Sequence, residues 1–80
     1  MTVQTFRDLL KQQPFEPFRI VMSSGVTYEV RHPEMAALTR TAIYVGIDIA
    51  DDGVPAHFKI CSLLHITAIE PLNVEAATSA

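Results

Sequence analysis

Cysteine and glycine are both scarce in this sequence. Cys61 is the single cysteine in 80 residues, so no internal disulfide can form, and no clustered cysteines and histidines suggest a structural metal. The three glycines lie far apart, which excludes a glycine-rich loop that would cradle a phosphate. A domain this small must therefore be stabilised by its hydrophobic core or by association.

Long hydrophobic runs are also absent. Charged residues interrupt every apolar run before the roughly 20 residues that a membrane-spanning helix needs. Residues 1–13 contain Arg7, Asp8 and Lys11, so they lack the apolar centre of a secretory signal. We therefore expect a cytoplasmic protein without a membrane partner. Positive charge is scarce as well, and the net charge of −3 argues against non-specific binding to nucleic acid.

Apolar residues, by contrast, make up 49% of the chain. A small soluble domain needs polar groups to cover its surface, so this fraction favours burial of apolar surface between copies of the chain. A compact monomer with a dense core is the alternative. We expect a homo-oligomer.

The segment Pro14-Phe15-Glu16-Pro17-Phe18 separates two kinds of pattern. Before it, apolar residues recur at helical spacing, and Thr2 or Thr5 can cap the start of the helix. The apolar face holds Val3, Phe6, Leu9 and Leu10, and the polar face holds Gln4, Arg7, Asp8, Lys11 and Gln12. The prolines end the helix, and regular strand pairing should begin at about Phe18.

After Phe18 the apolar residues alternate with the period of a strand. Residues 18–22 and 26–31 predict a hairpin in which Gly25 supplies the positive φ of the turn. Further along, the sequence predicts a short helical turn over 33–38, strands over 41–47, 57–62 and 65–70, and a loop over 48–56. Residues 73–80 should form a flexible tail.

The predicted fold class is therefore α+β, mainly β. An N-terminal helix packs on about five short antiparallel strands, which is the layout of a small barrel. Residues 1–72 should form this single domain.

Two patches of the sequence carry a resemblance: Ile20-Val21-Met22-Ser23-Ser24-Gly25 and Leu64-His65-Ile66-Thr67-Ala68-Ile69. The first is similar to the first strand and glycine turn of the Sm-like family, which includes bacterial Hfq, and the second is similar to that family's second motif. The resemblance implies an Sm-like or SH3-like small barrel. The resemblance implies a ring of six or seven subunits, closed through the edges of the strands at 57–62 and 65–70, with RNA at the pore or rim. His65 matches an RNA-contacting position, whereas Leu64 stands where a basic residue is expected.

The chain also resembles a group of small, functionally uncharacterised bacterial proteins. The shared patterns are Phe-Arg-x-Leu-Leu, Pro-Phe-x-Pro-Phe, His-Pro-Glu and Leu-His-Ile-x-x-Ile-Glu-Pro. This second resemblance implies no activity.

Candidate RNA-binding residues are Gln4, Arg7 and Lys11 on the polar helix face, together with His65. The alternative is that Arg7 and Lys11 are ordinary solubility charges. Arg19 and Arg31 lie on the polar face of the hairpin, where Glu29 can neutralise them. Tyr44 and Phe58 have rings that could stack on bases, but their strand spacing favours the core.

Enzymatic and metal sites find little support. Cys61 and His65 are close in sequence, but they bracket a strand end and lack a third, orienting group. No pair of candidate metal ligands has ligand spacing on one element. These candidates are three histidines and two aspartates: His32, His57, His65, Asp51 and Asp52. We expect no catalysis, cofactor, metal or small-molecule substrate.

The sequence thus predicts a non-catalytic small barrel that self-associates and serves as an interaction or scaffolding protein. The alternative is an Sm-like protein that binds single-stranded RNA.

Overall fold

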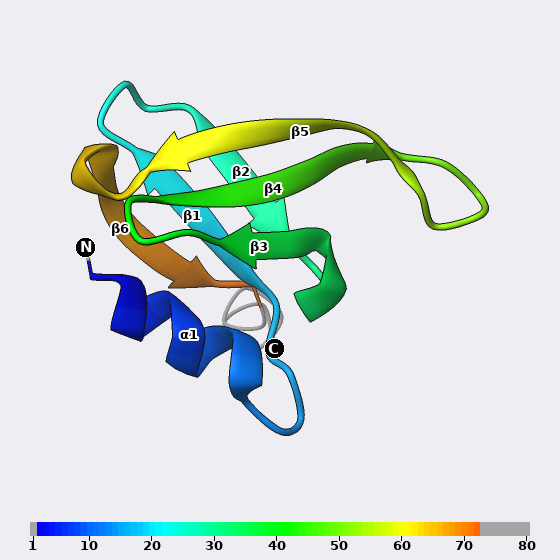
Figure 1. The fold of residues 1–80 in the computed structure, drawn as a ribbon, viewed down its shortest axis with the longest axis horizontal. Helices are drawn as coiled ribbons and strands as arrows, with labels where there is room; N and C mark the ends of the chain where they lie inside the picture. Colours follow the sequence, from blue (N-terminus) through cyan, green and yellow to red (C-terminus); the bar gives the residue numbers. More distant parts are fainter. Residues whose placement is uncertain (1, 73–80) are drawn as a thin grey trace, which may run out of the picture.

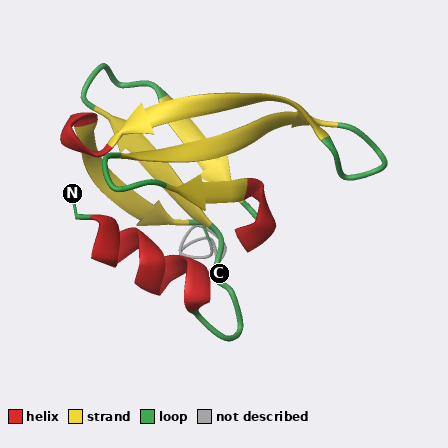
Figure 2. Ribbon diagram, in the orientation of Figure 1, coloured by secondary structure: helices red, strands yellow, loops and turns green. Residues whose placement is uncertain are grey.

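The computed structural model describes residues 2–72 as an N-terminal helix followed by six antiparallel strands in two sheets (Figure 1; Figure 2). The expected α+β, mainly β class is confirmed, but the strands number six, one more than predicted. The tail predicted for residues 73–80 lies outside the described residues. The elements are α1 (Val3–Lys11), β1 (Phe18–Met22), β2 (Thr27–Val30), η1 (Pro33–Met35), β3 (Ala36–Leu38), β4 (Ala42–Ile49), β5 (Pro55–Ser62), η2 (Leu63–His65) and β6 (Ile66–Pro71).

Helix α1 starts with the predicted cap. The Thr5 backbone N–H donates to the Thr2 hydroxyl at 3.4 Å, which satisfies one of the free donors of the first turn. Phe6 on the apolar face is completely buried. After Lys11 the chain turns through the proline segment and enters β1 at Phe18, where the sequence predicts that strand pairing begins.

The first sheet has the strand order β2-β1-β6. The predicted hairpin of β1 and β2 is present, with Ile20 opposite Tyr28. Gly25 in its turn has a φ of 91°, a conformation that favours glycine. Strand β6 pairs antiparallel on the other side of β1 and places Ile69 opposite Ile20.

The second sheet has the order β3-β4-β5 and contains the strand that sequence patterns missed. A helical turn was expected over 33–38, but the 3₁₀ turn ends at Met35 and Ala36–Leu38 is strand β3. Its partner is β4, with Ala37 opposite Tyr44. Pairing along an existing strand edge therefore overrides the helix propensity of Ala and Leu.

The hairpin of β4 and β5 is longer than predicted. A loop was expected over 48–56, yet β4 runs to Ile49 and β5 starts at Pro55. Asp48 has a φ of 54°, a left-handed conformation that Asp tolerates better than most residues, and Gly53 closes the turn with a φ of 82°. The hairpin consequently projects beyond the rest of the molecule (Figure 1).

The core lies between the two sheets and is covered by α1, which contacts β3. Buried residues come from both sheets, including Ile20 of β1 and Ile43 of β4, so the two sheets share one core. Within residues 2–72 the strand pairing runs inside each sheet. Closure into a barrel stays a prediction.

Candidate interaction surfaces

Strand β5 presents two large apolar side chains to solvent. Phe58 is 53% exposed and Ile60 is 64% exposed. Ile60 lies opposite the partly exposed Tyr44 of β4, and residues opposite each other in a ladder share a face of the sheet. We call Tyr44, Phe58 and Ile60 the apolar strip. The prediction that Phe58 belongs to the core is wrong, because the other face of β5, which carries Cys61, packs inward.

Strands β5 and β6 are both at the edge of a sheet. β5 pairs with β4 alone and β6 with β1 alone, so in residues 2–72 the outer edge of each strand lacks a strand partner. Such edges can pair with a strand of another chain. They are also the two strands through which the Sm-like resemblance implies subunit contacts.

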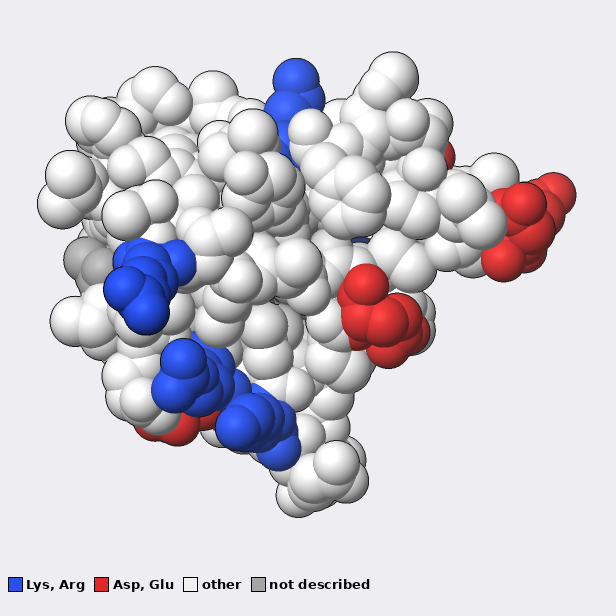
Figure 3. Space-filling view, viewed as in Figure 1, with Lys and Arg blue, Asp and Glu red and all other residues white. Residues whose placement is uncertain are grey.

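Three basic side chains lie on α1 or in the turn next to it. Arg7 and Lys11 project from α1, and Arg40 lies in the turn after β3, the strand that α1 contacts. Figure 3 shows Lys and Arg side chains clustered over α1 and next to it. In the described part of the chain, all three side chains are exposed and free of ion pairs. We call these three residues the basic face.

The other two predicted RNA-binding residues are placed differently. The Gln4 side-chain amide donates to the Asp8 carboxylate at 2.8 Å, so it is already engaged on the helix surface. His65 is exposed at the end of η2, and its backbone carbonyl accepts from the Ser23 N–H at 2.7 Å. The structure thus keeps Gln4 on the helix with Arg7 and places His65 beside the β1–β2 turn.

An end groove of about 280 Å³ lies next to the basic face. Val3 lines it one helical turn before Arg7, and Arg40 lines it from the β3–β4 turn. Leu64 of η2 is 90% exposed at this groove, although leucine normally favours burial. The full lining is Thr2, Val3, Arg40, Thr41, Ser62, Leu63 and Leu64.

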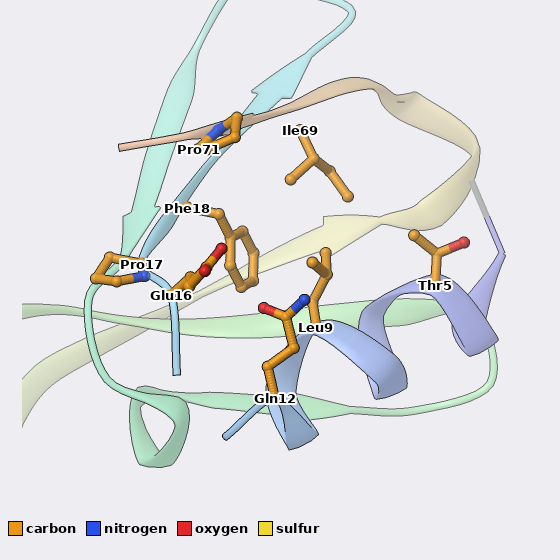
Figure 4. A pocket seen from close by; sticks show the side chains of 8 residues that line it. All are labelled: Thr5, Leu9, Gln12, Glu16, Pro17, Phe18, Ile69 and Pro71. Atoms are coloured by element: carbon orange, nitrogen blue, oxygen red, sulfur yellow. The ribbon is translucent and has the colours of Figure 1, made fainter. Parts of the chain in front are cut away.

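A second groove, of about 360 Å³, runs between α1, the start of β1 and β6 (Figure 4). Its lining is Thr5, Leu9, Gln12, Glu16, Pro17, Phe18, Ile69 and Pro71. Leu9 and Ile69 face this space from opposite walls, and Glu16 is the one charged residue among the lining residues. The groove therefore offers apolar contact with little polar chemistry.

No family model, curated protein or solved structure matches this chain. The Sm-like resemblance and the resemblance to small bacterial proteins stay predictions.

The side chain of Cys61 belongs to the core. It is completely buried, and this burial raises the pKa of its thiol because the thiolate would lose hydration. A raised pKa disfavours the thiolate, which is the nucleophilic form. His65, the base considered for a thiolate pair, is exposed. The geometry does not support that pair.

The candidate metal ligands are dispersed on the surface. His32, His57 and Asp51 are exposed on separate elements. Across residues 2–72, no three His, Cys, Asp or Glu side chains gather closely enough to hold a metal ion. The same residues include no helix with the length and apolar content to span a membrane.

The arginines of the first sheet are engaged in ion pairs. Arg19 contacts Glu29 at 3.4 Å and Glu70 at 3.3 Å, and Arg31 contacts Glu29 at 2.7 Å. The predicted neutralisation by Glu29 is confirmed. The hydrogen bond from Arg31, with a further contribution from Arg19, lowers the pKa of Glu29. Positive charge without an acidic partner therefore concentrates on the basic face.

Proposed function

We propose that this chain is a non-catalytic small-barrel module that self-associates and serves as an interaction or scaffolding protein. The observation that carries the proposal is the combination, on β5, of an unpaired strand edge with the apolar strip. Native proteins often protect an exposed edge with charges or prolines, and β5 has Lys59 and starts at Pro55, but Phe58 and Ile60 on either side of Lys59 remain exposed. A second strand laid along this edge would satisfy its backbone groups, and the partner subunit would cover Phe58 and Ile60.

Light scattering behind a sizing column tests this proposal. The wild-type chain at tens of micromolar should have the mass of several copies. The double variant Phe58→Thr/Ile60→Thr should shift toward a monomer, because threonine keeps a strand preference while it removes apolar surface. Circular dichroism should stay unchanged, since both side chains are exposed within one copy.

A matched control separates the apolar strip from general loss of surface hydrophobicity. Val26 lies in the β1–β2 turn region and is 49% exposed. Val26→Thr should leave the mass unchanged. A monomeric wild-type chain at the same concentration would defeat the proposal.

A second candidate function is binding of single-stranded RNA, as the Sm-like resemblance implies. The specific observation in its favour is that Arg40 lies in the turn after β3, the strand that α1 contacts, so α1 and its neighbouring turn carry three exposed positive charges without an ion pair in the described fold. Binding to phosphates releases counterions, and affinity should therefore fall steeply with salt.

Fluorescence anisotropy with a labelled single-stranded RNA tests this candidate. Arg7→Ala/Lys11→Ala should abolish binding at low salt. The variant Arg31→Ala/Lys59→Ala removes the same number of positive charges elsewhere and should retain it. If the wild-type chain does not bind at low salt, RNA binding is excluded.

A further inference from the structure

The tip of the β4–β5 hairpin combines exposed apolar residues with acidic ones. Ile49 is 47% exposed and Val54 is 59% exposed, on the two sides of the turn. Asp51 and Asp52 lie between them and are exposed as well. Figure 3 shows acidic side chains together at this projecting end. We call Ile49, Asp51, Asp52 and Val54 the hairpin tip.

The end groove combines the same two properties with the opposite charge. Leu64 and Val3 supply apolar contact, while Arg40 lines the groove and Arg7 follows Val3 by one helical turn. The hairpin tip and the groove lie toward opposite ends of the longest dimension, which measures 37 Å (Figure 1). Within one copy they cannot meet.

We propose that the hairpin tip of one copy docks into the end groove of a second copy. Ile49 and Val54 would cover Leu64 and Val3, and the carboxylates of the tip would face the guanidinium groups at the groove. This inference rests on the proposed self-association and adds a second, charge-dependent contact to that of the apolar strip. Because the tip and the groove lie toward opposite ends of the chain, we expect the contact to run head to tail from copy to copy, which is a heterologous interface.

Charge complementarity identifies the occupant. The chain carries a net charge of −3, yet the basic face has three positive groups and no ion pair among the described residues. The hairpin tip supplies negative charge and apolar surface together, and the groove accepts both. RNA would neutralise the positive charges but would not match the apolar part of the groove, because the groove lining contains no aromatic ring on which a base could stack.

Two variants reverse the charges without disturbing the local fold. Asp52 accepts a hydrogen bond from the Val54 N–H at 3.0 Å, and asparagine retains a carbonyl oxygen for that bond. The tip variant is therefore Asp51→Lys/Asp52→Asn. The groove variant is Arg7→Glu/Arg40→Glu. Both change exposed side chains only.

Sedimentation velocity of each variant alone and of an equimolar mixture tests the docking. Each variant alone should associate at least about tenfold more weakly than wild type, because like charges then face each other or attraction is lost. The mixture should recover association, since the positive tip of one variant meets the negative groove of the other. Wild-type association should weaken as salt rises, because the contact depends on exposed charges.

Glu34→Lys, which reverses the charge of an exposed acidic residue on η1, is the control and should associate like wild type.

Unchanged association of both the tip variant and the groove variant, or a mixture of the two that fails to recover association, overturns the docking. If Phe58→Thr/Ile60→Thr dissociates while both charge variants stay associated, docking is wrong and the proposed self-association stands. If wild type is monomeric, both are wrong. RNA binding lost in the groove variant, with association unaffected by the tip variant, would assign the groove to RNA instead.

Discussion

Phe18 is the residue at which the helix, the first strand and the proline segment meet. Its ring lies 6.2 Å from that of Phe6 and 6.0 Å from that of Phe15, and it is 2% exposed. The two prolines hold the chain in this path, so Phe15 and Phe18 fix α1 against the core. The Phe18 side chain therefore stabilises the fold through its packing in the core.

Phe18→Ala should lower the free energy of unfolding by about 3–5 kcal/mol, since it leaves a cavity in the core. Urea denaturation measures the loss. Phe58→Ala is the matched control and should cost far less, because Phe58 is already half exposed. Should Phe18→Ala fail to fold, Phe18→Leu removes less volume from the core and should lower the free energy of unfolding by less than Phe18→Ala, while still costing more than Phe58→Leu. Equal losses at Phe18 and Phe58 would contradict the assignment of the core.

Glu29 should make stability depend on pH. Its pKa is lowered from 4.5 in the folded state, chiefly by the hydrogen bond from Arg31. A lowered folded pKa adds stability that is fully present above the unfolded value and is lost as the pH falls through the folded value. The difference in unfolding free energy between wild type and Glu29→Gln should therefore be largest near pH 6 and shrink below pH 4.5. A difference that is constant over this range would contradict the ion pairs.

Among the elements, the β4–β5 hairpin depends on one close approach. A Cβ at Gly46 would lie 3.1 Å from the Cβ of Pro55 and 3.2 Å from its Cγ. These separations are shorter than ordinary contact between carbons, and the proline ring has little freedom to move. Gly46 therefore lets the two strands cross tightly at the base of the projecting tip.

Gly46→Ala should destabilise the fold by about 1–3 kcal/mol, as overpacking does elsewhere. The measurement is again the midpoint and slope of urea denaturation. Ala37→Ser, an exposed small residue on β3, serves as the control and should change stability little. Gly46→Ala at wild-type stability would mean that Pro55 moves freely.

Elements set by local chemistry could be predicted from the sequence, and those set by distant partners could not. The strand start at Phe18 and the turn at Gly25 follow from prolines and from a positive φ. Strand β3 forms because β4 offers an edge, which three residues of local sequence do not encode. The alternation of apolar residues along β5 predicts that Phe58 is buried. In the fold, however, Cys61 lies opposite the buried Ile43 of β4, so the face of β5 that carries Cys61 packs in the core and Phe58 is exposed.

At the scale of the whole molecule, surface features set by local spacing can also be predicted from the sequence, whereas those set by packing between distant elements cannot. Arg7 and Lys11 could be found from their helical spacing. Arg40 and Leu64 join them only through the packing of α1 against β3 and the position of η2, and no short-range pattern contains that information. The pairing of acidic tip and basic groove likewise appears only once the fold separates the two ends.

Head-to-tail contacts predict how the mass of the assembly changes with concentration. A heterologous interface either closes into a ring or continues into an open chain, and an open chain leaves a free hairpin tip at one end and a free end groove at the other. We therefore expect closure. Light scattering over a hundredfold range of concentration should reach a plateau at one fixed number of copies greater than two. A plateau at two copies would indicate a two-fold interface instead, and a mass that rises without limit would indicate an open chain.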